Sequence, residues 1–203
     1  MKAGVSSAGF SQWPETLGFG AIGDADLVRR FAAIVRGEYR AVGIHMALSP
    51  QADLATEPSW SRITGTFGED PARVGALVRA YVEGIQGHPR HLTTSGVATI
   101  VKHWVGYGAG VHGFDGHNEY GSAARFTPGQ CDVRVAPFLG AFKDGVSGVM
   151  PTYNILEGVT VDGKPLEAVG AGFNAQLLAG LLRGTHGFRG MVLSDWAITQ
   201  DCE

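Results

Sequence analysis

The strongest constraint on the fold is a repeated alternation of short apolar runs with longer amphipathic segments along the 203-residue chain. Four apolar runs predict strands: VGIHMALS (42–49), VATIVKHW (97–104), VSGVMPTY (146–153) and MVLSD (191–195). Helices are predicted at about Ala25–Ala41, Pro71–Ile85, Asp132–Lys143 and Asn174–Arg183. Uninterrupted apolar strands are typical of parallel sheets covered on both faces. The alternation therefore indicates an α/β fold.

Residues that start and stop helices support these boundaries. Asp24 is a suitable N-cap for the first helix, and Asp70 precedes Pro71 at the start of the second, which is expected to end at Gly87. Two long loops remain, a polar one at 50–70 and a Gly-rich one from Val105 to about Gln130. Because glycine is spread over many short connections, no interdomain linker is predicted.

The alternation fits an open doubly wound sheet and a (β/α)8 barrel alike. No GxGxxG phosphate loop joins a strand to a helix, and GYGAG is followed by more loop, which disfavours a nucleotide-binding Rossmann-like enzyme. Polar residues end three of the strands, as at the active-site rim of a barrel: Lys102, His103, Tyr153, Asn154, Ser194 and Asp195. This feature favours a barrel, but a barrel needs eight strands and only four are predicted, so both architectures stay open on these patterns alone.

Composition excludes several classes of partner. The 16 basic and 19 acidic residues are interspersed, for a net charge of −3, and no basic stripe predicts nucleic-acid binding. No apolar run is long enough for a membrane span, and no signal peptide is visible, which leaves a periplasmic or secreted location open for a longer protein. A disulfide between Cys131 and Cys202 cannot be deduced from their spacing, and two free thiols are the preferred interpretation.

No metal or cofactor is predicted. His112 and His117 share a loop, but the chain has no HExxH and no Cys/His ligand spacing. Taken singly, Asp195 fits a helix N-cap as well as a catalyst, and Arg62 fits an exposed surface residue. Lys102 and His103 together predict a cationic, donor-rich rim, because lysine is rarely buried without a partner.

Five segments in order resemble the catalytic barrel domain of glycoside hydrolase family 3. They are ALSPQADLATEPSWSRITGTFGEDP, the helix ending YVEGIQG, TIVKHWVGYG, GVMPTYNILEG and HGFRGMVLSDW. The resemblance extends from about Leu17 to Asp201 and is specific because the order of the segments agrees as well as their residues.

The resemblance implies a role for each matching residue. Asp195 corresponds to the catalytic nucleophile. Arg62, Lys102 and His103 correspond to residues that hydrogen-bond sugar hydroxyls, Tyr153 to a residue beside the nucleophile, and Trp196 to an aromatic that lines the entrance. Asp53 and Glu57 fall on loop positions interpreted as mainly structural.

The implied reaction is the hydrolysis of terminal β-D-glucosyl residues with retention. Two carboxyl groups about 5–5.5 Å apart carry such a reaction, and Lys102 and Arg62 would favour the ionised form of Asp195. Nothing before Leu17 resembles the family's first strand, and the last strand and helix are also expected to be absent. The resemblance therefore implies that residues 1–203 form one incomplete (β/α)8 domain. The general acid/base is expected on a C-terminal α/β domain outside this chain, so the chain alone is predicted to be weak or inactive. Glucose is favoured, with xylose and arabinose left open.

Two other functions remain open from the sequence. A β-N-acetylglucosaminidase of the same family would use Asp115 and His117, in Asp-Gly-His, as its acid/base. WVGYG stands where that branch usually has Phe-Pro-Gly-His-Gly, and the loop is longer than expected. A non-catalytic carbohydrate-binding remnant would keep the sugar contacts without an acid/base.

Overall fold

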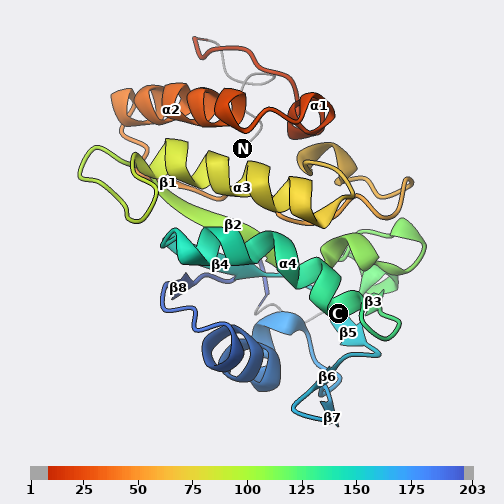
Figure 1. Ribbon diagram of the computed structural model, residues 1–203. Coiled ribbons are helices and arrows are strands. Elements are labelled where there is room, and N and C mark those ends of the chain that lie inside the picture. The colour runs from red at the N-terminus through yellow and green to blue at the C-terminus, as the bar shows by residue number, and fades with distance from the viewer. Residues whose placement is uncertain (1–8, 199–203) are drawn as a thin grey trace.

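A parallel four-stranded sheet forms the centre of the protein, in a computed structural model that describes residues 9–198. Its strands are β1 (Met46–Ala47), β2 (Ala98–Trp104), β4 (Gly148–Pro151) and β8 (Met191–Val192), in the order β1-β2-β4-β8 (Figure 1). Every neighbouring pair is parallel. The predicted α/β class and the four predicted strands are therefore confirmed.

The helices lie one after another along one side of this sheet (Figure 1). They are α2 (Ala25–Ala41), α3 (Pro71–Gln86), α4 (Gln130–Lys143) and η6 (Gln176–Thr185), preceded by the short α1 (Thr16–Ile22). The Asp24 carboxylate caps α2 by accepting from the amides of Asp26 and Leu27, and Asp70 caps α3 by accepting from the Arg73 amide at 2.7 Å. Both predicted caps are confirmed.

Several elements differ from the sequence prediction at their ends. The first and last strands are shorter than predicted, because each edge strand pairs with its single neighbour over two residues. The last helix is π-helical and shifted by two residues: the His186 amide donates to the Leu181 carbonyl, five residues back, at 3.0 Å. The short helix α1 was not predicted.

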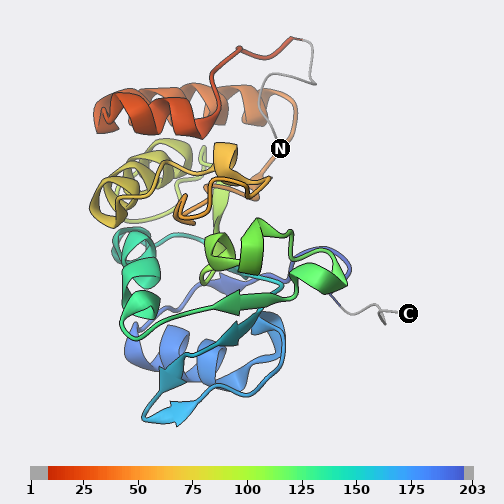
Figure 2. The ribbon, with the colours of Figure 1, turned by 90° about the vertical axis from the view of Figure 1, so that its right-hand side faces the viewer.

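The two long loops contain local structure that the apolar pattern did not reveal. Beyond the sheet lie a parallel pair, β3 (Ala123–Arg125) with β5 (Ile155–Glu157), and a hairpin, β6 (Thr160–Val161) with β7 (Lys164–Pro165) (Figure 2). Short 3₁₀ turns occupy η1 (Ile63–Gly65), η2 (Tyr107–Ala109), η3 (Val111–Gly113), η4 (Glu119–Gly121) and η5 (Ala171–Phe173). These loops carry many of the polar side chains described below.

The apolar core lies between the helices and the sheet. Its fully buried members include Trp104 on β2, Phe138 on α4 and Leu77 on α3, and the Trp104 and Phe138 rings meet edge-on at 5.3 Å between centroids. No helix within residues 9–198 has the length and apolarity to cross a bilayer. Cys131 is a free thiol, whereas Cys202 lies outside the described residues.

The close packing of α2 on α3 yields a stability prediction. A Cβ added at Gly84 would lie 2.4 Å from the Arg29 carbonyl oxygen and 2.7 Å from the Ala32 Cβ, whereas Gly37, exposed on α2, has open space around it. Gly84→Ala should lower the free energy of unfolding by about 1–3 kcal/mol because the helices must separate. Gly37→Ala should raise it by about 1 kcal/mol, since alanine favours a helix. Urea unfolding of both variants tests this, and equal effects would contradict the described packing.

Candidate active site

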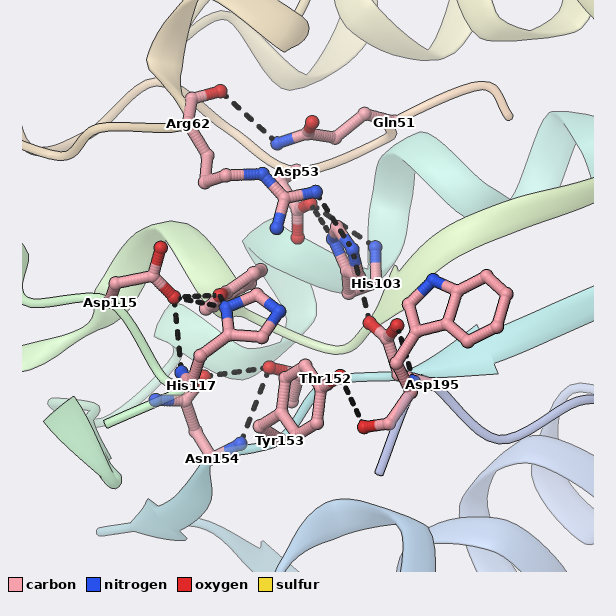
Figure 3. A network of polar contacts seen from close by, with 12 residues as sticks. Gln51, Asp53, Arg62, His103, Asp115, His117, Thr152, Tyr153, Asn154 and Asp195 are labelled. Carbon is pink, nitrogen blue, oxygen red and sulfur yellow. Dashed lines mark hydrogen bonds and ion pairs between the residues drawn. The ribbon is translucent and has the colours of Figure 1, made fainter. Parts of the chain in front are cut away.

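Polar residues from three strand ends meet at one rim of the sheet (Figure 3). Lys102 and His103 end β2, Tyr153 follows β4, and Asp195 follows β8. Because the carboxyl ends of parallel strands point the same way, side chains distant in sequence come together there. Arg62 reaches the same place from the loop that precedes η1.

Asp53 holds His103 in place. Beyond β1 the chain continues to pair with β2: the Lys102 amide donates to the Pro50 carbonyl at 3.0 Å, and the Ala52 amide donates to the Lys102 carbonyl at 2.6 Å. This pairing sets Asp53 beside His103, where Asp53 Oδ2 accepts from the His103 amide at 3.2 Å and lies 2.7 Å from the ring Nδ1. Both side chains are fully buried.

Asp195 lies on the other side of the His103 ring. Its Oδ2 is 3.7 Å from His103 Nε2, and its Oδ1 accepts from the Trp196 amide at 2.8 Å. The carboxylate is only 6% exposed. The Tyr153 hydroxyl donates to the Trp196 carbonyl at 2.6 Å. Burial, followed by the Asp195 charge, raises the pKa of Tyr153 to about 12, so this hydroxyl keeps its proton at neutral pH.

The positive charges of the rim come from Arg62 and Lys102. Arg62 Nη2 lies 3.5 Å from His103 Nε2, and its guanidinium covers the Tyr107 ring at 5.4 Å from the centroid. Burial, followed by Arg62, lowers the pKa of Lys102, while Asp195 and Asp53 act in the opposite direction.

One expectation for the rim is wrong. His103 was expected to contribute to a cationic rim, but burial lowers the pKa of its ring despite the neighbouring Asp53 carboxylate. A ring whose pKa lies below the ordinary value is neutral at pH 7. His103 therefore contributes polar nitrogens to the rim and no charge.

A second polar cluster lies beside the first, in the loop after β2. The Tyr107 hydroxyl donates to Asp115 Oδ1 at 2.6 Å, the His117 amide donates to the same oxygen at 3.0 Å, and His117 Nδ1 also contacts it. The His117 ring lies against the Tyr153 ring at 4.4 Å between centroids. The two clusters therefore meet at Tyr153 and Tyr107.

Tight backbone packing fixes this loop. Gly121 approaches Asp115 so closely that an added Cβ would lie 2.0 Å from the Asp115 carbonyl oxygen. The Asn154 side chain, which is fully buried, donates to the Gly121 carbonyl at 2.8 Å and accepts from the Thr152 hydroxyl at 2.7 Å. Residues that follow β4 thus hold the loop that follows β2.

The predicted site residues lie close together, and Trp196 differs from the others in being largely exposed. Arg62, Lys102, His103, Tyr153 and Asp195 share the rim, as the figure shows for those it labels (Figure 3). Trp196 is next to Asp195, and 73% of it is exposed. Its role at the entrance stays a prediction. Trp60, by contrast, is buried and stacks edge-on with Tyr107 at 5.1 Å.

Tyr107 was not predicted as a site residue, and Asp53 was predicted to be mainly structural. Tyr107 is fully buried yet contacts Arg62, His103 and Asp115. Its position three residues after the strand that carries Lys102 and His103 was the available signal. Asp53 lies in an apolar stretch, QADLA, where a charged residue that is buried needs a polar partner.

A cavity of about 300 Å³ adjoins the rim, and Arg62, Lys102, Gln51 and Ser49 line it together with Tyr81 and Trp13. Asp195 is not among the residues that line it. Within residues 9–198, no three His, Cys, Asp or Glu side chains gather as they would to bind a metal ion.

The chain matches the model of the glycosyl hydrolase family 3 N-terminal domain over residues 2–203. The chain belongs to glycosyl hydrolase family 3. A periplasmic β-glucosidase/β-xylosidase of Dickeya chrysanthemi is 59% identical over 199 residues, which make up 98% of this chain and 30% of that protein. The chain therefore spans less than a third of the length of this family 3 relative.

Solved structures of family 3 enzymes share the fold. A β-glucosidase from Listeria innocua in complex with glucose gives a TM-score of 0.78 and 29% identity over 92% of this chain and 24% of that one. A family 3 β-N-acetylglucosaminidase from Paenibacillus sp. str. FPU-7 gives a TM-score of 0.76 and 30% identity over 92% of this chain and 32% of that one. The predicted (β/α)8 class is confirmed, with the described strands forming part of such a barrel.

The Asp115 cluster predicts a pH-dependent contribution to stability. Burial opposes ionisation of Asp115, but hydrogen bonds from Tyr107 and His117 outweigh it and lower its pKa from 3.8 to about 2. Because the pKa is lower in the folded state, ionised Asp115 stabilises the fold at every pH above 3.8. This stabilisation is lost as the pH falls from 3.8 through about 2. Asp115→Asn should therefore be less stable than the unmodified chain at neutral pH by roughly 1 kcal/mol, a value discounted for solvent screening.

Urea unfolding between neutral pH and low pH measures this contribution. The difference between the Asp115→Asn variant and the unmodified chain should shrink as the pH falls. Glu69→Gln, which removes an exposed carboxylate, serves as the control for general charge effects. A difference that stays constant with pH would contradict the hydrogen-bonded network.

Proposed function

We propose that the protein hydrolyses terminal, non-reducing β-D-glucosyl residues with retention of configuration, and that Asp195 is the nucleophile. The observation that carries the proposal is the setting of the Asp195 carboxylate. It is 6% exposed, it keeps one oxygen on a backbone amide, and its other oxygen faces the polar rim. A carboxylate held this way is positioned for attack on a sugar ring lying in the rim.

The reaction has two steps. Asp195 attacks the anomeric carbon, a C–O bond forms to the carboxylate, and the bond to the glycosidic oxygen breaks as that oxygen takes a proton from a general acid. Water then loses a proton to the same group and attacks the anomeric carbon, which releases Asp195 and a sugar of unchanged configuration. No cofactor takes part in the proposed reaction.

The rim residues bind the sugar and stabilise its transition state. Lys102 and Arg62 donate hydrogen bonds to sugar hydroxyls and offset the charge of Asp195. Tyr153 keeps its proton and donates to the chain next to Asp195, which fixes that segment. Trp196 offers an exposed aromatic face that the apolar face of a sugar ring can cover.

The general acid/base is proposed to lie on a C-terminal α/β domain outside this chain. A retaining reaction needs a second carboxyl group about 5–5.5 Å from the nucleophile. Asp53 cannot serve, because it lies behind the His103 ring and is fully buried. The chain alone is therefore proposed to be weak or inactive.

The similar proteins support a substrate class and a location for the proposed enzyme. The Dickeya relative is described as periplasmic and as a β-glucosidase/β-xylosidase, and the Listeria enzyme was crystallised with glucose. These descriptions support β-glucosides as the substrate class, β-xylosides as a second one, and a periplasmic or secreted location.

Substitution of the nucleophile tests the proposal. In the gene product that contains residues 1–203, Asp195→Asn should lower kcat on an aryl β-glucoside by about 10³-fold or more, because an amide cannot form the glycosyl ester. Asp162→Asn is the matched control, since Asp162 is an exposed aspartate at positive φ, where asparagine is also accommodated. Comparable activity of the Asp195→Asn variant and the control would refute the assignment.

The 203-residue chain should be assayed beside the full gene product. Robust turnover by the chain alone would refute an acid/base outside it. Binding of glucose in isothermal titration, without turnover by either protein, would instead favour the non-catalytic carbohydrate-binding alternative.

One observation favours a second candidate, a β-N-acetylglucosaminidase. Asp115 and His117 are hydrogen-bonded to each other, and the His117 ring lies against Tyr153, whose hydroxyl bonds the chain next to Asp195. An Asp–His pair so near the nucleophile is suited to proton transfer. The His117 side chain is 41% exposed, so a leaving group can reach it.

Comparison of two aryl glycosides distinguishes these candidates. The β-glucosidase proposal predicts faster turnover of the aryl β-glucoside than of the aryl N-acetyl-β-glucosaminide, and at most a small effect of His117→Gln on kcat. The alternative predicts the reverse preference and a loss of about 10²–10⁴-fold on His117→Gln, the usual contribution of a general acid/base. The exposed His91→Gln variant is the matched control.

A further inference from the structure

Burial of the Asp53 carboxylate costs folding free energy, which is unusual for a residue that only supports the structure. Its side chain is fully buried, and its Oδ1 has no hydrogen-bond partner within residues 9–198, while Oδ2 takes both contacts from His103. A buried carboxylate with one unpaired oxygen destabilises a fold, and an asparagine would accept the same two hydrogen bonds without the charge. Both hydrogen-bonding contacts of Asp53 within residues 9–198 go to His103, so the role of Asp53 is sought in that ring.

The distances around His103 define its proton. Nδ1 lies 2.7 Å from Asp53 Oδ2, which is hydrogen-bond distance, and a carboxylate can only accept, so Nδ1 carries hydrogen. Nε2 lies 3.7 Å from Asp195 Oδ2, too far for a hydrogen bond. Arg62 Nη2, a donor, lies 3.5 Å from Nε2. The neighbourhood of Nε2 thus favours a lone pair on that nitrogen.

We propose that Asp53 is a positioning residue that fixes His103 as the Nδ1–H tautomer, so that Nε2 accepts a hydrogen bond from a sugar hydroxyl. The part of this inference that concerns the sugar rests on the proposed function. Nε2 and the Asp195 carboxylate are two acceptors 3.7 Å apart, so a group that contacts them from the open side of the rim must be a hydrogen-bond donor. A hydroxyl does so, and its oxygen remains free to accept from Arg62 or Lys102.

Hydrogen-bond donors and acceptors of the site come from different residues. Arg62 and Lys102 supply donors only, and Asp195 and the Asp53-locked His103 supply acceptors. A sugar hydroxyl fits because it both donates and accepts, whereas a halogen or an ether oxygen at the same position can only accept. Burial lowers the pKa of His103 and so supports a neutral ring that keeps this lone pair at neutral pH.

Nitrogen NMR of the sugar-free 203-residue chain, labelled with ¹⁵N-histidine, tests the tautomer. Long-range ¹H–¹⁵N spectra at neutral pH should show His103, assigned by loss of its signals in His103→Gln, with a protonated Nδ1 and an unprotonated Nε2. A ring protonated at Nε2, or at both nitrogens, would overturn the proposal. This measurement needs no turnover, so its failure is distinguishable from failure of the glycosidase proposal.

Two substitutions of Asp53 separate positioning from a merely structural role. Asp53→Asn keeps an acceptor, so it should preserve the tautomer and shift the Nδ1–H proton resonance upfield, because the charge-assisted bond is lost. Asp53→Leu removes the acceptor and should move the proton to Nε2. If Asp53→Leu fails to fold, the resonance shift in Asp53→Asn still decides, and an unchanged resonance overturns the role of the carboxylate.

Glucose titration extends the test to binding. Asp53→Leu should weaken glucose binding by about tenfold, the value of one hydrogen bond, and Asp53→Asn should recover most of it. Equal weakening in both variants would contradict an effect transmitted through the tautomer.

Discussion

Strand β2 is paired on both sides, and the position of the polar rim depends on that pairing. Its backbone bonds to β1 and the following residues 50–52 on one side and to β4 on the other. Because β2 is central and buried, its last residues cannot turn away from the site. The peptide groups that pair Lys102 with Pro50 and Ala52 are the same groups that set Asp53 against His103. Fold and site are thus specified by one ladder of hydrogen bonds.

Local sequence patterns predicted the layers of the fold but not its loops. The apolar run that forms β2 and the caps Asp24 and Asp70 depend on neighbours in sequence, so composition and spacing revealed them. The lengths of the edge strands β1 and β8 depend on how far each one pairs with its single neighbour, and no local sequence pattern encodes this. The strand pair β3–β5 joins residues about thirty positions apart in Gly-rich and turn-rich segments, where periodicity is weak.

Some residues of the candidate site were predictable from the sequence, and others were not. Asp195 and the Lys102–His103 pair stand at strand ends, where the α/β pattern concentrates function, so they could be selected from sequence. Tyr107 was missed because its importance comes from contacts with Arg62 and Asp115, which only the folded structure brings to its ring. The charge of His103 was also mispredicted, since burial is a property of the folded state and the sequence shows only the residue type.

A closed series of contacts joins the two polar clusters of the site. From His103 it runs through ring contacts, hydrogen bonds and one polar approach of 3.7 Å, in the order His103, Tyr107, Asp115, His117, Tyr153, Trp196, Asp195 and back to His103. His103, Tyr107 and Asp195 are buried, so a change of charge at one of these three is only weakly screened from the other two. The Asp115–His117 pair therefore contacts Tyr107 and Tyr153, which lie beside His103 and Asp195, whether or not the pair transfers a proton. Because a supporting role and direct proton transfer would use the same contacts, only the change in substrate preference and rate on altering His117 separates them.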